Sequence, residues 1–393
     1  MSDAVETITV TAGHRVARKM RAQILVNGRA VPETRLEQFA LSRTRYSRAD
    51  TAEINLAVDR AALSKITGNY WFDLAATSGT ATADTDVLIQ MRDEAVAGAQ
   101  WVTVFQGLMD HVEWTPTGTS LVVECRDYLA KLLDMRVQDA WLNKTGADLM
   151  KTLISAAGLT PQVSFPASMT GQYWQIEHKR LSHSAHGRFQ TAFDLARYIA
   201  NSAGCDLYAS GKTIVCNPYP TSNGGSAATH TLKYQDKGPD SAIVSNAMSL
   251  SFKRDYQIAK GVVVHVMSWD SRQRAKFEYY WSAEGGSPKK AANAGTLHSF
   301  KVPGRSMQDV QNAAKQKYDE IVAHGREVHM TIPGRIKLQP RDFFTLTGTN
   351  STWDGQSYTV DAVSSSFSWD GGFQQDVTLR NRDVTQDEAD DDA

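Results

Sequence analysis

The sequence predicts a β-dominated α+β fold in which two β-rich blocks flank a central α/β block. Alternating apolar and polar residues fill the first and last thirds of the chain. Two capped helical segments and two short strands occupy the middle third. Turn residues such as Asn-Gly and Gly-Gly separate the β segments. With 393 residues, the chain has room for two or three domains.

We expect four divisions of the chain. Residues 1–125 form the first β domain, and residues 126–240 form an inserted α/β domain. Residues 241–385 form the second β domain, which also carries one long helix. Residues 386–393 are an acidic tail that is expected to be disordered, because it has too little apolar surface to bury.

The first β domain is read from alternation and turn chemistry. RAQILVNGRA alternates around Ile24 and Val26 and then reaches Asn27-Gly28, a strong hairpin signal. The further expected strands are EINLAVDR, DVLIQMRD, WVTVFQGLMDHVEWT and TSLVVECRD. Short strands at this spacing are typical of a barrel or a sandwich.

The helical period takes over after residue 126. TGADLMKTLISAAGL and TAFDLARYIANSAG each begin with Thr, carry Asp three residues later, and end at Gly, which is the pattern of a capped helix. The short strands CDLYAS and KTIVCNPY follow, and NPYPTSNGGSAATH is expected to be a linker.

The β pattern returns from residue 241. SMQDVQNAAKQKYDEIVAHG, with Ser306 and Asp309 at its start and Gly325 at its end, is expected to be the longest helix. The expected strands are AMSLSFKRD, GVVVHVMSWD, AKFEYYWS, REVHMTIPG, FFTLTGTN, QSYTVDAVSSSFSWD and FQQDVTLRNRD. The polar loop at 283–297 is expected to project and contact a neighbouring protein.

Charge and composition exclude several classes of protein. The formal net charge is -1 and the estimated pI is about 6.8, so the chain is not a basic scaffold that grips nucleic acid. Three cysteines do not make a disulfide framework and fit synthesis in a reducing cytosol. No apolar run is long enough for a membrane helix and no signal peptide is visible, so we expect no membrane insertion.

No catalytic constellation stands out, so no catalytic residue, cofactor or metal is predicted. His178, His183 and His186 could bind a metal, but a polar loop with solvated imidazoles explains them better because further ligands are lacking nearby. Cys205 and Cys216 have no C-x-x-C neighbour and are expected to be buried thiols.

Carboxylates and tryptophans also have simple structural explanations. Glu113, Glu124 and Asp127 lie near strand ends, yet nothing marks a glycosidase pair among them. The tryptophans in strand-like runs could stack on sugars, although packing or subunit contacts explain them better. These are Trp101, Trp114, Trp269 and Trp369.

Two segments carry a family resemblance. Residues 102–137 resemble a segment of phage tail baseplate hub proteins of the late-control D type, and residues 333–382 resemble the last strands of these proteins. The matching positions in the first segment are Phe105, Gly107, Asp110, Val112, Glu113, Arg126 and Asp127. Those in the second are Pro340, Asp342, Asp354, Gly355, Tyr358, Val360, Gly371, Gly372 and Phe373.

The resemblance implies a structural protein and not an enzyme. Such a hub is a homotrimer whose subunits each carry two tail-tube-like β-barrel domains with an inserted α/β domain. It acts as a symmetry adaptor between the sixfold tail tube and the threefold central spike of a contractile tail. Its expected partners are the tube or tube-initiator protein, the spike and neighbouring wedge proteins. DNA would pass through its lumen during ejection without specific binding. The expected location is the virion, after assembly in the host cytoplasm.

Two other functions remain open at the level of sequence. A tail-associated cell-wall hydrolase would need a carboxylate pair or a metal cluster in a cleft. A β-rich receptor-binding or carbohydrate-binding tail module would show an exposed aromatic patch without a ring.

Overall fold

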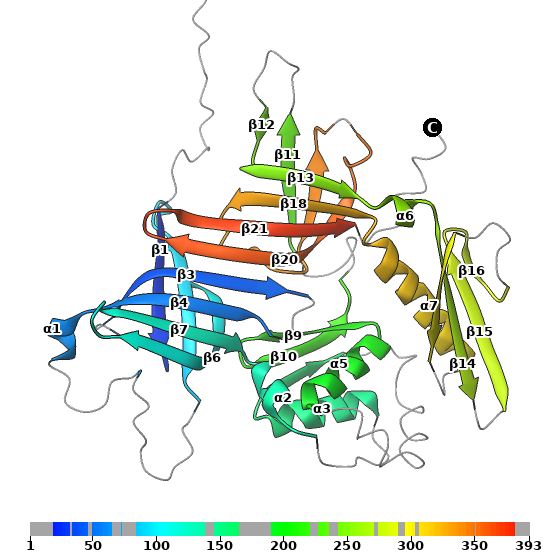
Figure 1. Cartoon of the computed structure of the whole chain (residues 1–393), viewed down its shortest axis with the longest axis horizontal. Helices are drawn as coiled ribbons and strands as arrows, with labels where there is room; N and C mark the ends of the chain where they lie inside the picture. Colours follow the sequence, from blue (N-terminus) through cyan, green and yellow to red (C-terminus); the bar gives the residue numbers. More distant parts are fainter. Residues whose placement is uncertain are drawn as a thin grey trace, which may run out of the picture.

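The computed structural model describes most of the chain, and all structural statements below refer to this part. Its described residues are 19–31, 34–45, 49–64, 72, 84–137, 145–164, 190–220, 227–235, 243–270, 274–289, 295–302, 306–349 and 351–381. They form one 14-stranded sheet, a four-stranded sheet and a three-stranded sheet, with helices packed beside the two smaller ones. The fold is therefore β-dominated with several sheets, as the sequence predicts (Figure 1).

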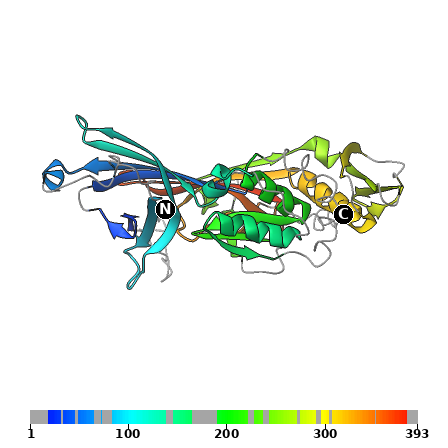
Figure 2. The same cartoon turned by 90° about the horizontal axis from the view of Figure 1, so that it is seen from below.

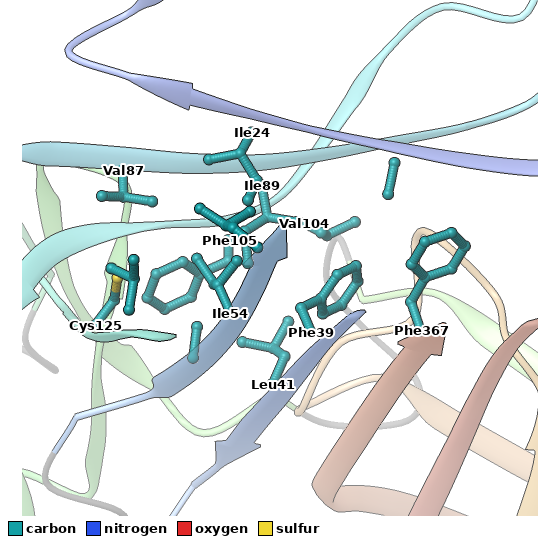
Figure 3. Close-up of a cluster of buried hydrophobic side chains, with 14 of the residues drawn as sticks. Ile24, Phe39, Leu41, Ile54, Val87, Ile89, Val104, Phe105, Cys125 and Phe367 are labelled. Carbon is teal, nitrogen blue, oxygen red and sulfur yellow. The ribbon is translucent and has the colours of Figure 1, made fainter. Parts of the chain in front are cut away.

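The first β block contains seven strands in the order β2-β1-β5-β6-β7-β4-β3. They are β1 (Met20–Val26), β2 (Arg29–Ala30), β3 (Thr34–Thr44), β4 (Thr51–Val58), β5 (Asp86–Asp93), β6 (Val102–Thr115) and β7 (Ser120–Asp127). The short helix α1 (Arg60–Leu63) follows β4. Alternate residues of these strands point inward, so the curled sheet encloses one apolar core. Figure 3 shows Ile24, Ile54 and Phe105 converging there.

The second β block also contains seven strands, in the order β12-β11-β19-β20-β21-β18-β13. They are β11 (Thr229–Gln235), β12 (Val244–Ser245), β13 (Ser249–Arg254), β18 (Arg326–Pro333), β19 (Phe343–Thr347), β20 (Ser357–Ser368) and β21 (Gly372–Asn381). Phe344, Tyr358 and Leu379 are fully buried in its core.

The two β blocks repeat one topology. If the strands of each block are numbered in chain order, both sheets read 2-1-5-6-7-4-3. One difference is the direction of the first strand, because β1 is antiparallel to β5 whereas β11 is parallel to β19. Residue alternation in the sequence predicts two strand-rich blocks but does not predict this repeat.

One strand joins the two blocks into a continuous sheet. The first residues of β20 pair with β19, and its second half, Ala362–Ser368, pairs antiparallel with Gln38–Thr44 of β3. Phe39 and Phe367 stack across this junction with ring centroids 5.6 Å apart. The first core therefore includes side chains from the second block, as Figure 3 shows for Phe367.

The middle block packs three helices with a small sheet. Its elements are α2 (Ala130–Asp134), α3 (Gly146–Ala156), β8 (Thr160–Val163), α5 (Ala192–Ser202), β9 (Cys205–Ser210) and β10 (Thr213–Pro218). Thr145 and Thr191 accept hydrogen bonds from the backbone N–H groups of Asp148 and Asp194, which confirms both predicted helix starts. Buried leucines and isoleucines of α3 and α5 share a core with Cys205 and Cys216.

A separate unit interrupts the second β block between β13 and β18. It consists of α6 (Tyr256–Ala259), β14 (Val262–Asp270), β15 (Ala275–Ser282), β16 (Gly285–Ser287), β17 (Thr296–Lys301) and α7 (Met307–Val322). Ser306 and Asp309 form the predicted capping box of α7. Val310, Ala314 and Tyr318 of α7 pack on β14 to make an independent core. Figures 1 and 2 show this unit at one end of the molecule.

The strand pairing bears on the expected domain division. β11 lies before the expected boundary at residue 240, yet it is hydrogen-bonded to β19 of the second β block. The four strands β14 to β17 lie inside 241–385 but form a sheet of their own, because they have their own core against α7. We therefore keep the division as a proposal, with the second β block beginning near residue 227.

Candidate functional site

The first site-like feature is a bulge on β6 that holds an ion pair. The β6–β7 register skips Asp110, which lies between Met109 and His111. Arg126 on β7 donates to both Asp110 oxygens, at 2.5 Å from Nε and 3.0 Å from Nη2. It also donates to Asp134 at 3.0 Å. The predicted positions Asp110 and Arg126 are thus in contact, and the pair fixes the register where β6 bends.

The same device recurs in the second β block. The β20–β21 register skips Asp361, and the Arg380 guanidinium on β21 lies 3.6 Å from its carboxylate. Arg126 is opposite Leu108, two residues before the first bulge, and Arg380 is opposite Thr359, two residues before the second. The repeat therefore extends from the strand order to individual side chains.

This correspondence leaves a sequence signature that the pattern search missed. Val-x-Cys-Arg-Asp ends β7 and Val-x-Leu-Arg-Asn ends β21, and each follows an Asp-x-Val step at the bulge. The predicted site residue Asp127 corresponds to Asn381. Comparing the chain with itself could have found this signal.

A buried charged cluster joins all three blocks. Asp206 on β9 accepts from Arg45, at the end of β3, at 3.2 Å and from Arg341, before β19, at 2.7 Å. Arg45 also lies 3.9 Å from Asp361 at the second bulge. Burial opposes a charge on Asp206, but the Arg341 and Arg45 guanidinium groups outweigh it and lower the pKa of Asp206. The cluster therefore ties the middle block to the junction of the two β blocks.

Arg341 has an unusual backbone conformation within this cluster. Its φ is 85°, in the left-handed region that costs a non-glycine residue about 1–3 kcal/mol. Its N–H donates to Val360 O at 2.8 Å, and its guanidinium lies 3.9 Å from the centre of the Tyr208 ring. The first contact holds the Arg341 backbone to β20, and the second places its side chain against the middle block.

A carboxyl pair lies in a cavity beside this cluster. Asp50 and Asp127 line a space of about 350 Å³ together with Arg43 and Arg341. Asp127 accepts from Leu129 N–H at 2.9 Å at the start of α2, and its own N–H donates to Asp50 O at 2.9 Å. Burial first, and then the Asp50 charge, raise the pKa of Asp127 to about 7. Because Asp127 is committed to the α2 backbone, it has a structural role here.

The other predicted carboxylates do not join this pair. Glu124 is opposite His111 and Glu113 is opposite Val122, towards the far end of the β6–β7 hairpin. Asp127 is opposite Gly107, six residues from Glu113 along β6. The ladder therefore separates Asp127 from Glu113, whereas Glu113 and Glu124 are diagonal neighbours on one face of the hairpin.

Phe105 and Gly107 of β6 have packing roles. Phe105 is buried in the first core. A Cβ on Gly107 would lie 2.6 Å from the Phe105 ring and closer still to the carbonyl oxygen of Arg126. Only glycine fits here because the β7 backbone approaches so closely.

Gly107→Ala is expected to lower the free energy of unfolding by about 1–3 kcal/mol, because the added methyl group would overlap the Phe105 ring and the β7 backbone. Chemical denaturation of the variant and the parent measures this loss. Gly118→Ala is the matched control in the same hairpin, since its nearest contact would be an ordinary 3.4 Å to Thr115. Equal losses in the two variants would contradict this explanation.

The predicted positions of the second segment lie in turns and in the second core. Asp354 accepts from the N–H groups of Gly348 and Thr349, both at 3.0 Å, and Gly355 adopts a φ of 75°. The buried Tyr358 hydroxyl donates to Trp353 O at 3.2 Å.

In the β20–β21 turn, Gly371 N–H donates to Ser368 Oγ at 2.8 Å and Gly372 has a φ of 72°. Asp342 accepts from Gln339 N–H at 3.0 Å.

No group of three or more His, Cys, Asp or Glu side chains in the described residues could hold a metal ion. No described helix is long and apolar enough to cross a membrane. Cys125, Cys205 and Cys216 are buried and reduced. The predicted cluster of His178, His183 and His186 lies outside the described residues, as does the acidic tail.

Comparisons with known proteins place the fold. No protein-family model and no curated protein matches this sequence. The tail protein from Neisseria meningitidis MC58 aligns over 94% of this chain and 99% of its own, with a TM-score of 0.61 and 14% identity. The chain has the fold of phage tail proteins. The 43 kDa tail protein of prophage MuSo2 from Shewanella oneidensis shares this tail-protein fold, with a TM-score of 0.57, 10% identity and coverage of 93% and 99%.

A second kind of assembly contains the same fold. A chain of the Francisella PdpA–VgrG complex aligns over 94% of this chain with a TM-score of 0.56 and 9% identity. Only 59% of that longer chain is covered. The tail-protein fold thus also occurs as part of a larger polypeptide.

Proposed function

We propose that this protein is the baseplate hub of a phage tail, a homotrimer that adapts the sixfold tail tube to the threefold central spike. The observation that carries the proposal is the repeated topology of the two β blocks, down to the Asp110–Arg126 and Asp361–Arg380 pairs. Three such chains present six similar β blocks, which match a sixfold partner. The three copies of the other elements retain threefold symmetry and match the spike.

The junctions inside the chain suit such a load-bearing ring. The β blocks are joined by a continuous ladder and by the buried Asp206 cluster, so both hydrogen bonds and ion pairs cross their junction. The tail proteins named above share this fold over nearly their whole length, which supports a structural role in a tail over an enzymatic one. The proposed partners are the tube or tube-initiator protein, the spike and neighbouring wedge proteins of a contractile baseplate in the virion.

A DNA conduit is part of this proposal. The near-neutral net charge of -1 suits a lumen through which DNA passes without tight binding. The positions highlighted by the family resemblance then serve the framework of the ring. In the described residues they lie at close contacts between strands, at bulges and in turns.

The purified protein is expected to have three times the 43.3 kDa mass of one chain and to form an annulus. Light scattering measures the mass, and negative-stain imaging shows the ring. The control is the same measurement after adding the tube and spike proteins of the same phage, which should extend the ring on both faces. A compact single chain that persists in their presence would overturn the hub assignment.

A further inference from the structure

The junction between β20 and β3 provides a template for contacts between copies. β20 is the sixth strand of its block and β3 is the third strand of the other block. The half of β20 beyond the Asp361 bulge extends past β19, and β3 pairs with that half, from Ala362 opposite Thr44 to Ser368 opposite Gln38. At this junction, the part of the sixth strand that follows its bulge pairs with the third strand of the other block.

The same two kinds of edge recur on β6 and β13, away from the junction. β6, the sixth strand of the first block, pairs with β5 only as far as Leu108, and no described strand pairs with that edge beyond the Asp110 bulge. β13, the third strand of the second block, pairs only with β18 among the described strands. Figure 1 shows β13 on the side of its block away from β3, and Figure 2 shows the teal β6–β7 hairpin projecting at one end.

The repeated registers fix which residues would meet. The bulges make His111 the counterpart of Ala362, so Glu113 corresponds to Ser364 and Trp114 to Ser365. In the first block, Thr51 on β4 is opposite both Ser42 on β3 and Arg126 on β7. In the second block, Glu327 on β18 is opposite both Lys253 on β13 and Arg380 on β21. Because Arg126 and Arg380 are equivalent, Lys253 is the counterpart of Ser42, and Phe252 is the counterpart of Leu41.

We infer that β6 of one copy pairs antiparallel with β13 of the next, with Glu113 opposite Lys253 and Trp114 opposite Phe252. In the template, Ser364 is opposite Ser42 and Ser365 is opposite Leu41. The next step places Thr115 opposite Ser251. This contact would be the subunit interface of the proposed trimer, so the inference rests on the proposed function.

The chemistry of the two edges is complementary in this register. Opposite charges, aromatic pairs and Thr–Ser pairs are the cross-strand neighbours that stabilise antiparallel sheets. Trp114 and Phe252 are 38% and 36% exposed, although both are large apolar side chains. The Lys253 side chain is 70% exposed, with its ammonium 3.6 Å from Glu327 on the adjacent strand. The contact would cover the aromatic pair and bring Glu113 to Lys253.

The pairing of two different edges suits a closed assembly. Each copy offers β6 at one edge of the sheet and β13 at another, so the contact is head-to-tail and generates a ring if its rotation closes. Contacts between copies would then repeat the contact within each chain, and first and second β blocks would alternate around one continuous sheet. No described strand edge at these two sites would remain exposed to unwanted pairing.

Cysteine cross-linking of Glu113→Cys/Lys253→Cys tests the register. Directly opposite residues have Cβ atoms about 4.5–5.5 Å apart, so a short bis-thiol reagent should give covalent dimers and trimers on a denaturing gel. The native cysteines are buried and provide little background. Glu113→Cys/Ser249→Cys is the matched control, because Ser249 lies four residues along the same face of β13, roughly 13 Å away. We expect at least tenfold less cross-linking in the control.

Light scattering on the same samples separates the two proposals. A trimeric mass with no more cross-linking than the control would overturn the β6–β13 register and leave the hub assignment standing. Covalent chains longer than trimers would overturn the closed ring while supporting the strand pairing. A single-chain mass that persists with tube and spike proteins, without cross-links, would overturn both.

Discussion

Asp206→Ala is expected to lower the free energy of unfolding by about 3–5 kcal/mol, because it leaves two buried guanidinium groups without their shared counter-ion. The Arg45 and Arg341 side chains that bind Asp206 are only 3% and 16% exposed. Removing one partner of a buried ion pair costs more than removing an exposed pair, since the remaining charges stay desolvated. Denaturant unfolding followed by circular dichroism measures the change.

Two matched variants separate charge from packing in this experiment. Asp206→Asn keeps the side-chain shape and should lose less stability than Asp206→Ala. Asp134→Ala removes an acid that also binds an arginine, Arg126, but whose side chain is 65% exposed, so it should cost less than about 1 kcal/mol. Similar decreases in the free energy of unfolding for Asp206→Ala and Asp134→Ala would show that the buried Asp206 cluster does not stabilise the fold more than an exposed ion pair does.

Local patterns in the sequence predicted the helices and many of the strands. Capping residues at Thr145, Thr191 and Ser306 act within one helical turn, so their meaning does not depend on the rest of the chain. The hairpin at Asn27-Gly28 is similarly local, and both residues adopt the positive φ values that the predicted turn requires.

Pairing between distant segments could not be predicted in this way. The parallel partner of β11 is β19, more than one hundred residues away, and β3 pairs with β20 across most of the chain. Arg45, Asp206 and Arg341 look like solvated charges in the sequence, because their burial depends on three blocks meeting. The repeat was obscured because the bulge aspartate precedes its arginine by different intervals in the two blocks, since the strands of the β20–β21 hairpin run further beyond the bulge than those of the β6–β7 hairpin.

Stability is expected to fall as the pH rises from about 4 to about 7 because of Asp127. Its pKa is raised from 3.8 to about 7, by burial first and then by the Asp50 charge. Between these values the folded protein holds a proton that the unfolded chain has released, so raising the pH favours unfolding. A shift of this size corresponds to at most about 4 kcal/mol above pH 7.

Asp127→Asn should flatten this profile, since the neutral amide can still accept the Leu129 N–H while carrying no charge to bury. The second β block already places Asn381 at the equivalent position, where it is buried and donates to Gln356 Oε1 at 2.6 Å. The variant is expected to match the parent near pH 4 and to be more stable at pH 8, in urea unfolding at a series of pH values. Asp50, whose pKa burial also raises, should retain part of the slope. Asp134→Asn is the control that keeps the parent slope, and parallel profiles for Asp127→Asn and the parent would mean that Asp127 is already ionised in the folded protein.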